Sequence, residues 1–569
     1  MNNLIAAYIR TASPDYSIYL AQSVHFAMSC DGGHSFTPLN KNYGILFPKC
    51  RYNEENGIVS RGVCDVQMVK SGDTYIISGC EIERHQVKTG IFMDSKEDVQ
   101  TGAFVCWTTK DFVSFSEPER CLNRFPEGIS VDEESKPCAV DCNKAQSCSC
   151  TISVSSEIAS RLSELNKTVE FEAIKLPENV TVKTADELDS IKAEAIYTDG
   201  STHLKKVIWN KDAVDFTKPG QYEVDGRIFA RRFPFPVEER AWGDPIITLY
   251  EGKYYFIGTD DWGGNKMYEI RCADTPEDLF RADTRRVTLL EAETSEWDTT
   301  FWAPEFHIAG GRMCIFGTLG KGSFDPQSHV MRLKEGGDMM NPDDWEKPIR
   351  CVMPDGRYLS LNPLGDGKNG ITLDMTYIEV NDRGYAAWSY RTWAGTDSGS
   401  MIMIAEVDPK NPWQLLTYPK LLTRPDLGWE NIDGTDNNEG PHPIVTDDKV
   451  YLAYSGGNAA GDTYVVGMMT AEIDSELSNP DVWTKSATPW LASNFVEGEL
   501  GCGHNGFFID ELGDTYITYH GHKTLGNSAR IDGVRRVHFK KDGSPLLYMT
   551  NEQDLPIGKE DVKITITVK

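Results

Sequence analysis

Five residues that can carry acid–base chemistry recur at similar intervals in the C-terminal part of the chain. They are Asp244, Glu305, Asp374, Glu439 and His504, and the intervals between them range from 61 to 69 residues. Each begins a stretch with a short apolar run, a turn of Gly, Asp or Asn, and a second run of apolar and aromatic residues. This order is typical of a β-hairpin. The chain therefore repeats one hairpin five times, with a chemically competent residue at the head of each copy.

The residue types at these heads suit hydrolysis of a glycosidic bond. That reaction needs a protonated carboxylic acid at the leaving oxygen and an ionised carboxylate on the opposite face of the sugar. When the ionised group activates a water, the reaction inverts the anomeric carbon, and the two carboxyl groups lie roughly 6.5–9.5 Å apart. Carboxylates that lie close together also push their pKa values apart, so that one of them keeps its proton at neutral pH.

The elements that would bring the heads together are the blades of a radial repeat fold. Regular recurrence of one hairpin predicts a β-propeller, in which equivalent positions meet around one axis. We therefore expect an all-β protein with a five-bladed β-propeller over residues 237–550, whose heads line one end of a central funnel.

The rest of the chain divides into smaller parts. Residues 1–130 are β-rich and are expected to form an accessory module, in part propeller-like, because Cys64 to Ser78 resembles a degenerate copy of the blade pattern. We expect a cysteine-containing linker at 131–165 and a last strand within 551–569.

Residues 166–232 alternate apolar and polar positions with frequent turn signals, which predicts a small β-sandwich. The strings Tyr-Thr-Asp-Gly-Ser ending at Ser201, Val-Ile-Trp-Asn ending at Asn210 and Pro-Gly-Gln-Tyr-Glu-Val-Asp-Gly ending at Gly226 resemble a bacterial immunoglobulin-like domain. The resemblance implies an immunoglobulin-like domain inserted ahead of the propeller.

The five heads together resemble glycoside hydrolase family 43. They read Trp-Gly-Asp244-Pro, Trp-Ala-Pro-Glu305, Leu-Asp374, Glu439-Gly-Pro and Gly-His504-Asn, in that order, and the resemblance covers about 237–550. It implies a five-bladed β-propeller with inverting arabinofuranosidase, xylosidase or related activity. A lone Asp-Pro or Glu-Gly-Pro would be weak evidence, whereas five heads in register are specific.

The resemblance also implies a role for each head. Asp244 matches the general base, Asp374 the acid that orients its neighbour and tunes its pKa, and Glu439 the general acid. Like-charge proximity to Asp374 would hold the proton on Glu439 until the leaving oxygen takes it. Asp65, in Val-Cys-Asp-Val, is a rival for the base because family members often carry that residue near the start of the chain.

Further residues are expected around the sugar. Glu305 and Trp302 are placed near it by their position at a head, although Glu305 could equally have a structural role and His504 could be a core histidine. Arg535 resembles an arginine that points into the sugar pocket, with Arg536 as the alternative if the register slips by one. His504 resembles an axial histidine that holds a water-coordinated cation, which allows a structural calcium there although the chemistry requires no cofactor.

Several other residues could bind sugar or metal, but a purely structural role explains them equally well or better. Trp262, Trp388 and Tyr454 are weaker stacking candidates than Trp302, since aromatic residues of β-proteins are more often in the core. His520 and His522 are a weak candidate metal pair. Metal binding is also a minor alternative for the four cysteines spaced C-x3-C-x5-C-x-C, which are Cys138, Cys142, Cys148 and Cys150.

The amino-acid composition limits the classes of molecule that the protein is expected to bind. The chain of 569 residues carries a net charge of −29, which disfavours nucleic acid and anionic membranes and favours a neutral oligosaccharide. The N-terminus lacks the basic and apolar regions of a signal peptide, and fourteen scattered cysteines fit reduced thiols. These features predict a cytoplasmic protein, and the oligomeric state is left open.

The sequence thus favours an inverting exo-glycosidase, foremost an α-L-arabinofuranosidase acting on plant-derived oligosaccharides. A β-D-xylosidase or galactosidase of the same family is the near alternative. Two alternatives from other classes are a catalytically inactive carbohydrate-binding propeller and an extracellular adhesion protein, which the immunoglobulin-like domain suggests.

Overall fold

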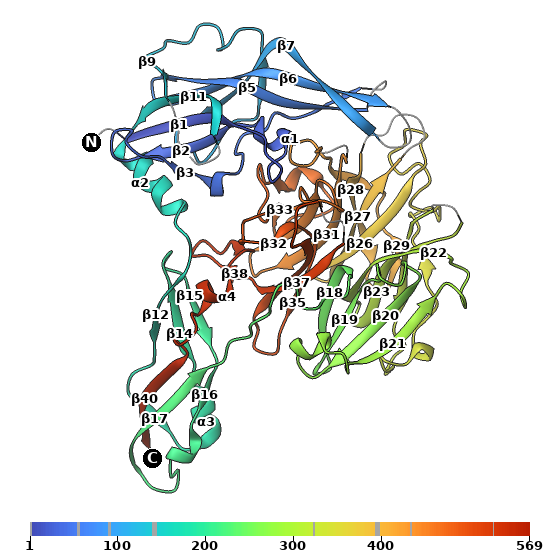
Figure 1. Ribbon diagram of the computed structural model, residues 1–569. Helices are drawn as coiled ribbons and strands as arrows, with labels where there is room; N and C mark the ends of the chain where they lie inside the picture. The colour runs from blue at the N-terminus through green and yellow to red at the C-terminus, as the bar shows by residue number, and fades with distance from the viewer. Residues whose placement is uncertain are drawn as a thin grey trace.

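The computed structural model describes residues 3–53, 57–88, 93–138, 145–322, 325–392, 399–432, 435–526 and 529–569. Strands dominate, and they form an N-terminal module, an immunoglobulin-like module and a propeller (Figure 1). The all-β class expected from the sequence is confirmed.

The propeller has five sheets, as expected. Blade 1 contains β18 (Gly243–Tyr250), β19 (Lys253–Thr259), β20 (Met267–Ala273) and β21 (Arg285–Glu291); blade 2 contains β22 (Thr299–Ala309), β23 (Arg312–Gly320), β24 (Gln327–Arg332) and β25 (Ile349–Arg350); blade 3 contains β26 (Ile371–Val380), β27 (Arg383–Arg391), β28 (Met401–Asp408), β29 (Asn411–Leu415) and β30 (Lys420–Thr423); blade 4 contains β31 (Asn438–Val445), β32 (Lys449–Gly456), β33 (Val465–Glu472) and β34 (Thr484–Lys485); blade 5 contains β35 (Leu500–Ile509), β36 (Thr515–His522) and β37 (Ile531–Arg536).

Three of the innermost hairpins turn through two consecutive residues with a left-handed backbone, and Gly310 and Gly311 form the turn between β22 and β23. Glu251 and Gly252 join β18 to β19 with φ values of 49° and 75°, and Asn381 and Asp382 join β26 to β27 with 51° and 61°. Two central residues with positive φ match the twist of the two strands. The five inner strands contact one another in a closed ring, since β18 touches both β22 and β35.

Every inner strand begins with a β-bulge at its head. The residues with positive φ at these bulges are Asp244, Ala303, Asp374, Gly440 and His504. The pairing between the first two strands of each blade shifts register at the same place. A positive φ is unfavourable for residues other than glycine, and such strain is often found at functional sites.

The bulges correct the alignment of the heads that the sequence suggested. Ala303, not Glu305, is the equivalent of Asp244, and Gly440, not Glu439, occupies that position in blade 4. Glu439 therefore precedes the bulge and Glu305 follows it, so these two acids lie at different depths from Asp244. Hydrophobic alternation does not reveal the offset, because a bulge uses one extra residue without interrupting the strand.

The N-terminal module is a two-sheet sandwich rather than a partial propeller. One sheet contains β1 (Asn3–Arg10), β2 (His25–Ser29), β3 (Thr37–Pro38), β10 (Lys136–Pro137) and β11 (Ala145–Val154); the other contains β4 (Arg51–Asn53), β5 (Gly57–Ser71), β6 (Thr74–Lys88), β7 (Met93–Thr109), β8 (Glu119–Cys121) and β9 (Glu133–Glu134). Apolar side chains from both sheets share one core.

The segment expected as a linker at 131–165 belongs largely to this sandwich. Strand β11 pairs antiparallel with β1 from Asn3 to Arg10, so the first and last strands of the module are neighbours. Helix α2 (Ser156–Leu165), capped by the Ser155 side chain, then leads to the next module. Cys150 is buried in β11, whereas Cys142 and the side chain of Cys148 lie outside the described residues. Cys138 and Cys150 carry free thiols.

The immunoglobulin-like module is completed by the last strand of the chain. Its sheets are built from β12 (Phe171–Lys175), β14 (Ala193–Tyr197) and β15 (Thr202–Lys205), and from β13 (Val180–Val182), β16 (Val207–Trp209), β17 (Gly220–Ile228) and β40 (Asp561–Val568), with α3 (Ala185–Asp189) alongside. Strand β40 pairs antiparallel with β17 and parallel with β13. The propeller is therefore inserted into the immunoglobulin-like module, the reverse of the expected order.

Buried ion pairs join the immunoglobulin-like module to the propeller. Asp554 of α4 (Asn551–Asp554) accepts hydrogen bonds from Lys205 of β15 and Arg536 of β37. Two short strands, β38 (His538–Phe539) and β39 (Pro545–Leu546), lie beside this contact. Since both cations contact one carboxylate, the two modules are held in a defined orientation.

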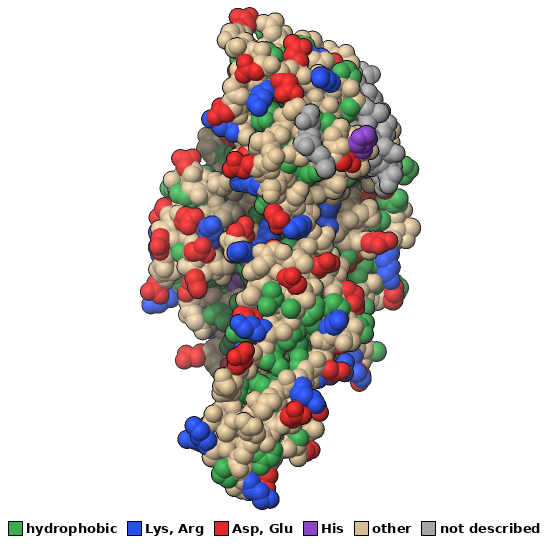
Figure 2. Space-filling model, turned by 90° about the vertical axis from the view of Figure 1, so that its left-hand side faces the viewer, with side chains coloured by type: hydrophobic (Ala, Val, Ile, Leu, Met, Phe, Trp, Pro, Cys, Tyr) green, Lys and Arg blue, Asp and Glu red, His purple; other side chains and the backbone are tan. Residues whose placement is uncertain are grey.

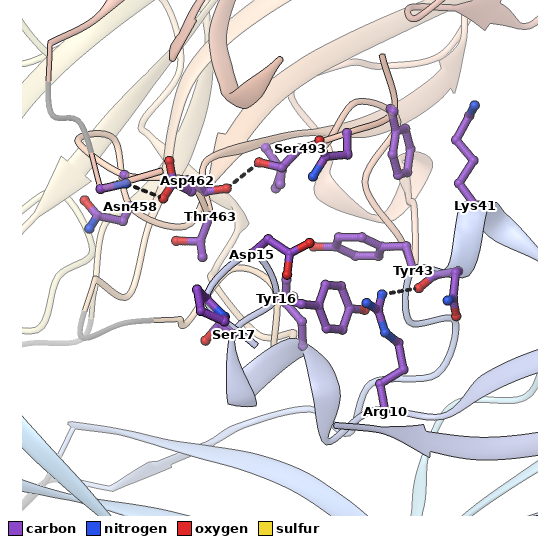
Figure 3. Close-up of a pocket in the computed structure, with 18 of the residues that line it drawn as sticks. Arg10, Asp15, Tyr16, Ser17, Lys41, Tyr43, Asn458, Asp462, Thr463 and Ser493 are labelled. Carbon is purple, nitrogen blue, oxygen red and sulfur yellow. Dashed lines mark hydrogen bonds between the residues drawn. The ribbon is translucent and has the colours of Figure 1, made fainter. Parts of the chain in front are cut away.

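The N-terminal module rests on blades 3 and 4 of the propeller. The N–H group of Cys50 donates to the carbonyl of Asp426, and Ser60 donates to the carbonyl of Asn431. Beside α1 (Ile18–Ala21) a cavity of about 670 Å³ separates the two parts. Figure 3 shows its polar lining from both sides, which includes Arg10, Asp15, Lys41, Asn458, Asp462 and Ser493. None of the five heads lines this cavity.

The acidic residues are scattered over the visible surface and are not gathered in one patch (Figure 2). Figure 2 shows Asp and Glu side chains spread over one face and interspersed with Lys and Arg, without a concentrated basic area on that face. Among the described residues, no helix combines the length and the apolar character needed to cross a membrane.

Candidate active site

Asp244 is a buried carboxylate surrounded by cationic and hydrogen-bonding groups. Its Oδ1 accepts a hydrogen bond from Arg530 Nη1 at 2.9 Å and lies 3.1 Å from His504 Nδ1. Its Oδ2 accepts from the Thr259 hydroxyl at 2.5 Å. Burial alone would raise the pKa of Asp244, but Arg530, and then His504 and His520, outweigh it and hold the pKa well below its usual range. Asp244 is therefore ionised at neutral pH.

Arg530 orients this carboxylate and was not identified from the sequence. Its Nε and Nη2 donate to the two carboxylate oxygens of Asp261 at 2.7 and 2.6 Å, which leaves Nη1 for Asp244. A guanidinium clamped on one carboxylate in this way presents its remaining donor in a fixed direction. Arg530 follows β36 in a segment without a recognisable motif, so only the fold reveals its role.

Asp374 is the opposite case to Asp244. It is 3% exposed, and its Oδ2 accepts hydrogen bonds from the Ser389 hydroxyl and the Gly440 N–H, each at 3.3 Å. Burial, and then repulsion from Glu439 and Asp244, raise the pKa of Asp374 well above its usual value. The repulsion between Asp374 and Glu439 that the family resemblance implied is thus present at Asp374, where it adds to the effect of burial.

Glu439 is only partly buried and is held by a neighbour in the same blade. Tyr464 of the β32–β33 connection donates its hydroxyl to Glu439 Oε1 at 2.8 Å. The Tyr464 ring stacks on His520, with ring centroids 5.4 Å apart and planes 11° apart. Since His520 also contacts Asp244, this stacked pair connects the acid of blade 4 to the acid of blade 1.

Trp302 occupies in blade 2 the position that Glu439 occupies in blade 4, because each comes immediately before the residue with positive φ. It is partly exposed. Trp262 lies in the connection after β19, beside Asp261, and 75% of its surface is exposed. Trp388 and Tyr454 are buried in the core. Sugar stacking by Trp302 stays a prediction.

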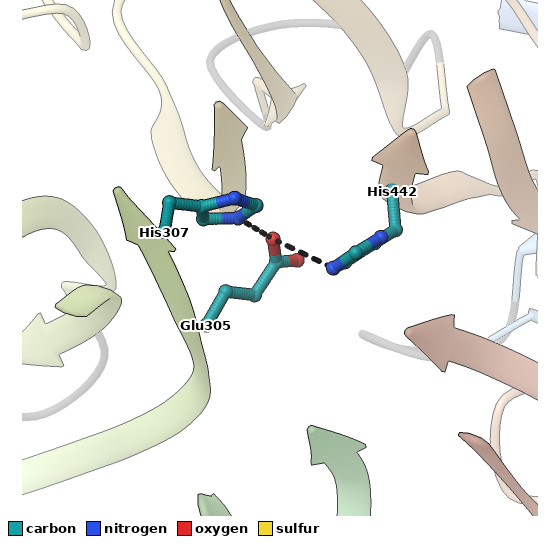
Figure 4. A group of neighbouring side chains, drawn as sticks. All are labelled: Glu305, His307 and His442. Carbon is teal, nitrogen blue, oxygen red and sulfur yellow. Dashed lines mark hydrogen bonds and ion pairs between the residues drawn. The ribbon is translucent and has the colours of Figure 1, made fainter. Parts of the chain in front are cut away.

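Glu305 lies deeper along the axis than the sequence implied. It is 1% exposed, and its Oε2 is 2.7 Å from His307 Nε2 and 3.9 Å from His442 Nε2 (Figure 4). Burial raises the pKa of Glu305 to about 7. Glu305 thus contacts two imidazoles, and its expected contact with the sugar stays a prediction.

His504 lies in the same ring as Asp244, as expected. Its Nδ1 contacts Asp244 Oδ1, and its Nε2 is buried without a hydrogen-bond partner within the described residues. Nε2 is thus the atom that His504 would offer to a cation. Calcium prefers six to eight oxygen ligands, so one imidazole nitrogen fits it only as a single ligand, and the calcium stays a prediction.

The sequence of this region matches a known family over more than half of the chain. The family described as "Glycosyl hydrolases family 43" matches residues 233–545, which contain all five heads. The chain belongs to glycosyl hydrolase family 43. A second match, to the group 4 bacterial Ig-like domain, covers residues 191–229 and confirms the immunoglobulin-like resemblance.

Individual relatives of the family-43 domain carry arabinofuranosidase names. "Alpha-L-arabinofuranosidase B" of Pyricularia oryzae is 28% identical over 54% of this chain and 61% of its own length. "Extracellular exo-alpha-(1->5)-L-arabinofuranosidase" of Streptomyces avermitilis is 28% identical over 55% and 62%. The chain thus spans about three fifths of the length of these curated relatives. The crystal structure of an α-L-arabinofuranosidase from Lactobacillus brevis is 27% identical, with 56% of this chain and 98% of that chain covered and a TM-score of 0.47.

The relatives contradict one expectation from the sequence. Two of them, from Streptomyces avermitilis and Streptomyces chartreusis, are named as extracellular enzymes. The expected cytoplasmic location is therefore wrong. Free thiols in a large domain, on which the expectation partly rested, do not identify a compartment.

Neither arginine expected in the sugar pocket of the family-43 domain lies beside Asp244. Arg535 donates to Glu499 at 2.5 Å and to the Tyr519 hydroxyl at 2.8 Å, inside blade 5. Arg536 contacts Asp554 at the immunoglobulin-like module. Consecutive strand residues point to opposite faces of a sheet, and both faces of β37 are covered here by other groups.

Asp65, the rival for the general base, belongs to the N-terminal sandwich. It lies at a β-bulge of β5 with φ of 48°, which explains its likeness to the heads. Its carboxylate pairs with Arg124 of the same module at 2.5 Å. The structure therefore favours Asp244 over Asp65, since only Asp244 is in the ring with Asp374 and His504.

Proposed function

We propose that the protein is an inverting exo-acting α-L-arabinofuranosidase that releases a terminal sugar from neutral, plant-derived oligosaccharides. The family supports a glycoside hydrolase, and the names of the curated relatives support the arabinofuranosyl group. These relatives are matched over only part of their length, so the activity of the whole protein rests on the site described above.

The observation that carries the proposal is the contrast between Asp244 and Asp374. One buried carboxylate is surrounded by Arg530 and two imidazoles, while the other faces Glu439 and backbone or hydroxyl donors. The lowered pKa suits Asp244 to the role of the base, and the raised pKa of Asp374 makes Asp374 unsuited to that role. The role of general acid is assigned to Glu439 from the family resemblance.

In the proposed reaction, Asp244 takes a proton from a water that attacks the anomeric carbon. Glu439 gives its proton to the leaving oxygen from the opposite face of the sugar, as an inverting mechanism requires. Asp374 acts as a positioning residue for Glu439, because its Oδ2 holds the N–H group of Gly440, the residue after Glu439. Tyr464 holds the Glu439 carboxyl from the other side.

The test is hydrolysis of a panel of nitrophenyl glycosides, including α-L-arabinofuranoside, β-D-xyloside and β-D-galactoside, with proton NMR to follow the anomer first released. The proposal predicts cleavage of the arabinofuranoside with inversion. Preferential cleavage of the xyloside or galactoside would support the alternative members of the family. If no glycoside of the panel is hydrolysed although the protein still binds sugars, the result would support a carbohydrate-binding propeller that lacks catalysis.

A further inference from the structure

Below the ring of Asp244 and Asp374, three further side chains converge on the propeller axis. Glu305 and His307 come from β22 of blade 2, and His442 comes from β31 of blade 4. One possible ligand atom from each residue lies within 4.8 Å of the other two. Figure 4 shows the Glu305 carboxylate between the two imidazole rings, with a nitrogen of each ring directed at it.

The bulges explain why these three residues meet. Glu305 and His442 are each the first residue to resume regular pairing after the bulge of their blade. His307 follows Glu305 by two positions and so points to the same side of its strand. The three are thus directed toward the axis from two blades that are not adjacent, since blade 3 lies between them.

The cluster is surrounded by aromatic side chains and the Thr376 hydroxyl, which lies 3.3 Å from His307 Nε2, and the described contacts include no Lys or Arg side chain. His307 packs edge-on against Phe316 and near Tyr377, and His442 packs against Phe507. Glu305 is 1% exposed and His442 is 4% exposed. A buried carboxylate is costly unless it is paired or coordinates a metal, and the groups that face Glu305 here are the neutral type of metal ligand.

We propose that Glu305, His307 and His442 bind one divalent transition-metal ion, with zinc as the representative. Two imidazole nitrogens and one carboxylate oxygen form a ligand set that zinc uses when one coordination position stays open. Nitrogen-rich sites select zinc and its neighbours in the first transition row rather than calcium or magnesium, which prefer oxygen. The proposal concerns the layer below His504, whose Nδ1 contacts Asp244, and does not involve that residue.

The distances allow coordination with small side-chain movements. Ligands about 2.1 Å from a tetrahedral zinc lie roughly 3.4 Å from one another. The hydrogen bond of 2.7 Å between His307 Nε2 and Glu305 Oε2 would lengthen, and the separation of 3.9 Å between His442 Nε2 and Glu305 Oε2 would shorten. The ion would connect β22 to β31 across the axis. Its ligand in β31, His442, follows Glu439 by three residues in the chain.

The proposal is tested by metal binding to the full-length chain, purified with any affinity tag removed. Metal is stripped with a chelator, and ZnCl₂, CoCl₂ and CaCl₂ are then titrated by calorimetry. We expect one Zn²⁺ per chain, d–d absorption bands of a low-coordinate Co²⁺ complex that excess Zn²⁺ abolishes, and a higher unfolding temperature with Zn²⁺.

Single substitutions assign the site. Glu305→Gln and His442→Gln should each weaken zinc binding by about a hundredfold or more, since loss of even an outer-shell partner costs 10–100-fold. The matched control is His329→Gln, a buried histidine of blade 2 whose Nδ1 bonds the Gln327 carbonyl. This variant should bind zinc as the parent does.

Three outcomes would overturn the proposal: no zinc or cobalt binding by the folded parent chain, zinc binding that both substitutions leave unchanged, or calcium binding in preference to zinc that the same two substitutions abolish. The cobalt spectrum of the parent keeps the test decisive even if a variant fails to fold. Because the readout is binding, a protein that bound zinc but cleaved no glycoside would contradict only the proposed function.

Discussion

The backbone N–H of Asp244 donates a hydrogen bond to Nδ1 of His520 at 3.2 Å, and this contact joins the first inner strand to the last blade. Equivalent contacts join other neighbouring blades, because Thr259, Thr318 and Ser455 accept from the N–H groups of the next bulge residues, Ala303, Asp374 and His504. At these four junctions the residue opposite one bulge holds the bulge of the following blade, whereas the N–H of Gly440 is held by Asp374 itself. Catalytic groups positioned by such supporting hydrogen bonds keep their geometry without moving during the reaction.

Replacement of the proposed base should abolish hydrolysis whatever the leaving group. Asp244→Asn keeps the shape of the side chain but cannot take a proton from water, so kcat is expected to fall by about 10²–10⁴-fold. The loss should be similar for a nitrophenyl arabinoside and for an arabino-oligosaccharide. Initial rates on both substrates check this, and retention of more than a tenth of parental kcat would exclude Asp244 as the base.

Replacement of the proposed acid should affect substrates differently. Glu439→Gln should lose about 10²–10⁴-fold in kcat on an unactivated oligosaccharide. The loss on a dinitrophenyl glycoside should be much smaller, since that leaving group departs without a proton. The ratio of the two losses is the measurement, and equal losses on both substrates would assign proton donation to another residue.

The stability of the protein should increase when Asp374 becomes neutral. The folded-state pKa of Asp374 is raised, whereas an unfolded Asp has a pKa of about 3.9. Such a group stabilises the fold below the unfolded pKa, and this contribution is lost as pH rises toward the folded pKa, by about 1.4 kcal/mol per pH unit. Asp374→Asn should therefore unfold at a higher temperature than the parent at pH 7. The difference in unfolding temperature between variant and parent should shrink as the pH falls toward 4. Thermal unfolding of both proteins from pH 4 to pH 7 checks this, and a difference that does not change with pH would contradict the prediction.

Removal of the Arg530 charge should shift the pH dependence of catalysis. Arg530 is the largest of the influences that lower the pKa of Asp244, so Arg530→Gln should raise that pKa and move the acidic limb of the kcat/KM profile to higher pH. Arg281→Gln, at an exposed position outside the site, provides the control for a general loss of charge. An acidic limb that stays at the parental pH would show that Arg530 does not tune the base.

The last strand should stabilise the immunoglobulin-like module. Ile566 of β40 is fully buried, and truncating such a side chain costs about 2–5 kcal/mol. Ile566→Ala should therefore lower the unfolding midpoint in urea, whereas Thr565→Ala, the exposed neighbour, should leave it within error. Equal midpoints for the two variants would mean that β40 adds nothing to the stability of the module.

The residues that gather at the site were predictable where a residue type and its local pattern coincide. Asp244, Asp374, Glu439 and His504 all stand at the start of a hairpin, and all four surround the axis. Arg530, Tyr464 and His307 were missed, because they carry no motif and reach the site only when the blades close into a ring. His442 stood within the Glu439-Gly-Pro-His string, and equal spacing from the bulge was the signal that could have identified it.

The sequence by itself determined which segments become strands and which residues begin each blade, because apolar alternation and turn residues act over a few neighbouring positions. Only the tertiary structure decided the depth of each acid on the axis, since the bulges displace Glu439 and Glu305 to either side of the position held by Asp244. It also decided the place of β40, which pairs with β17 although the whole propeller lies between these two strands in the sequence. Such pairings depend on closure of the ring and on backbone hydrogen bonds. Because every residue except proline can donate such a bond, the sequence of side chains does not reveal which strands pair.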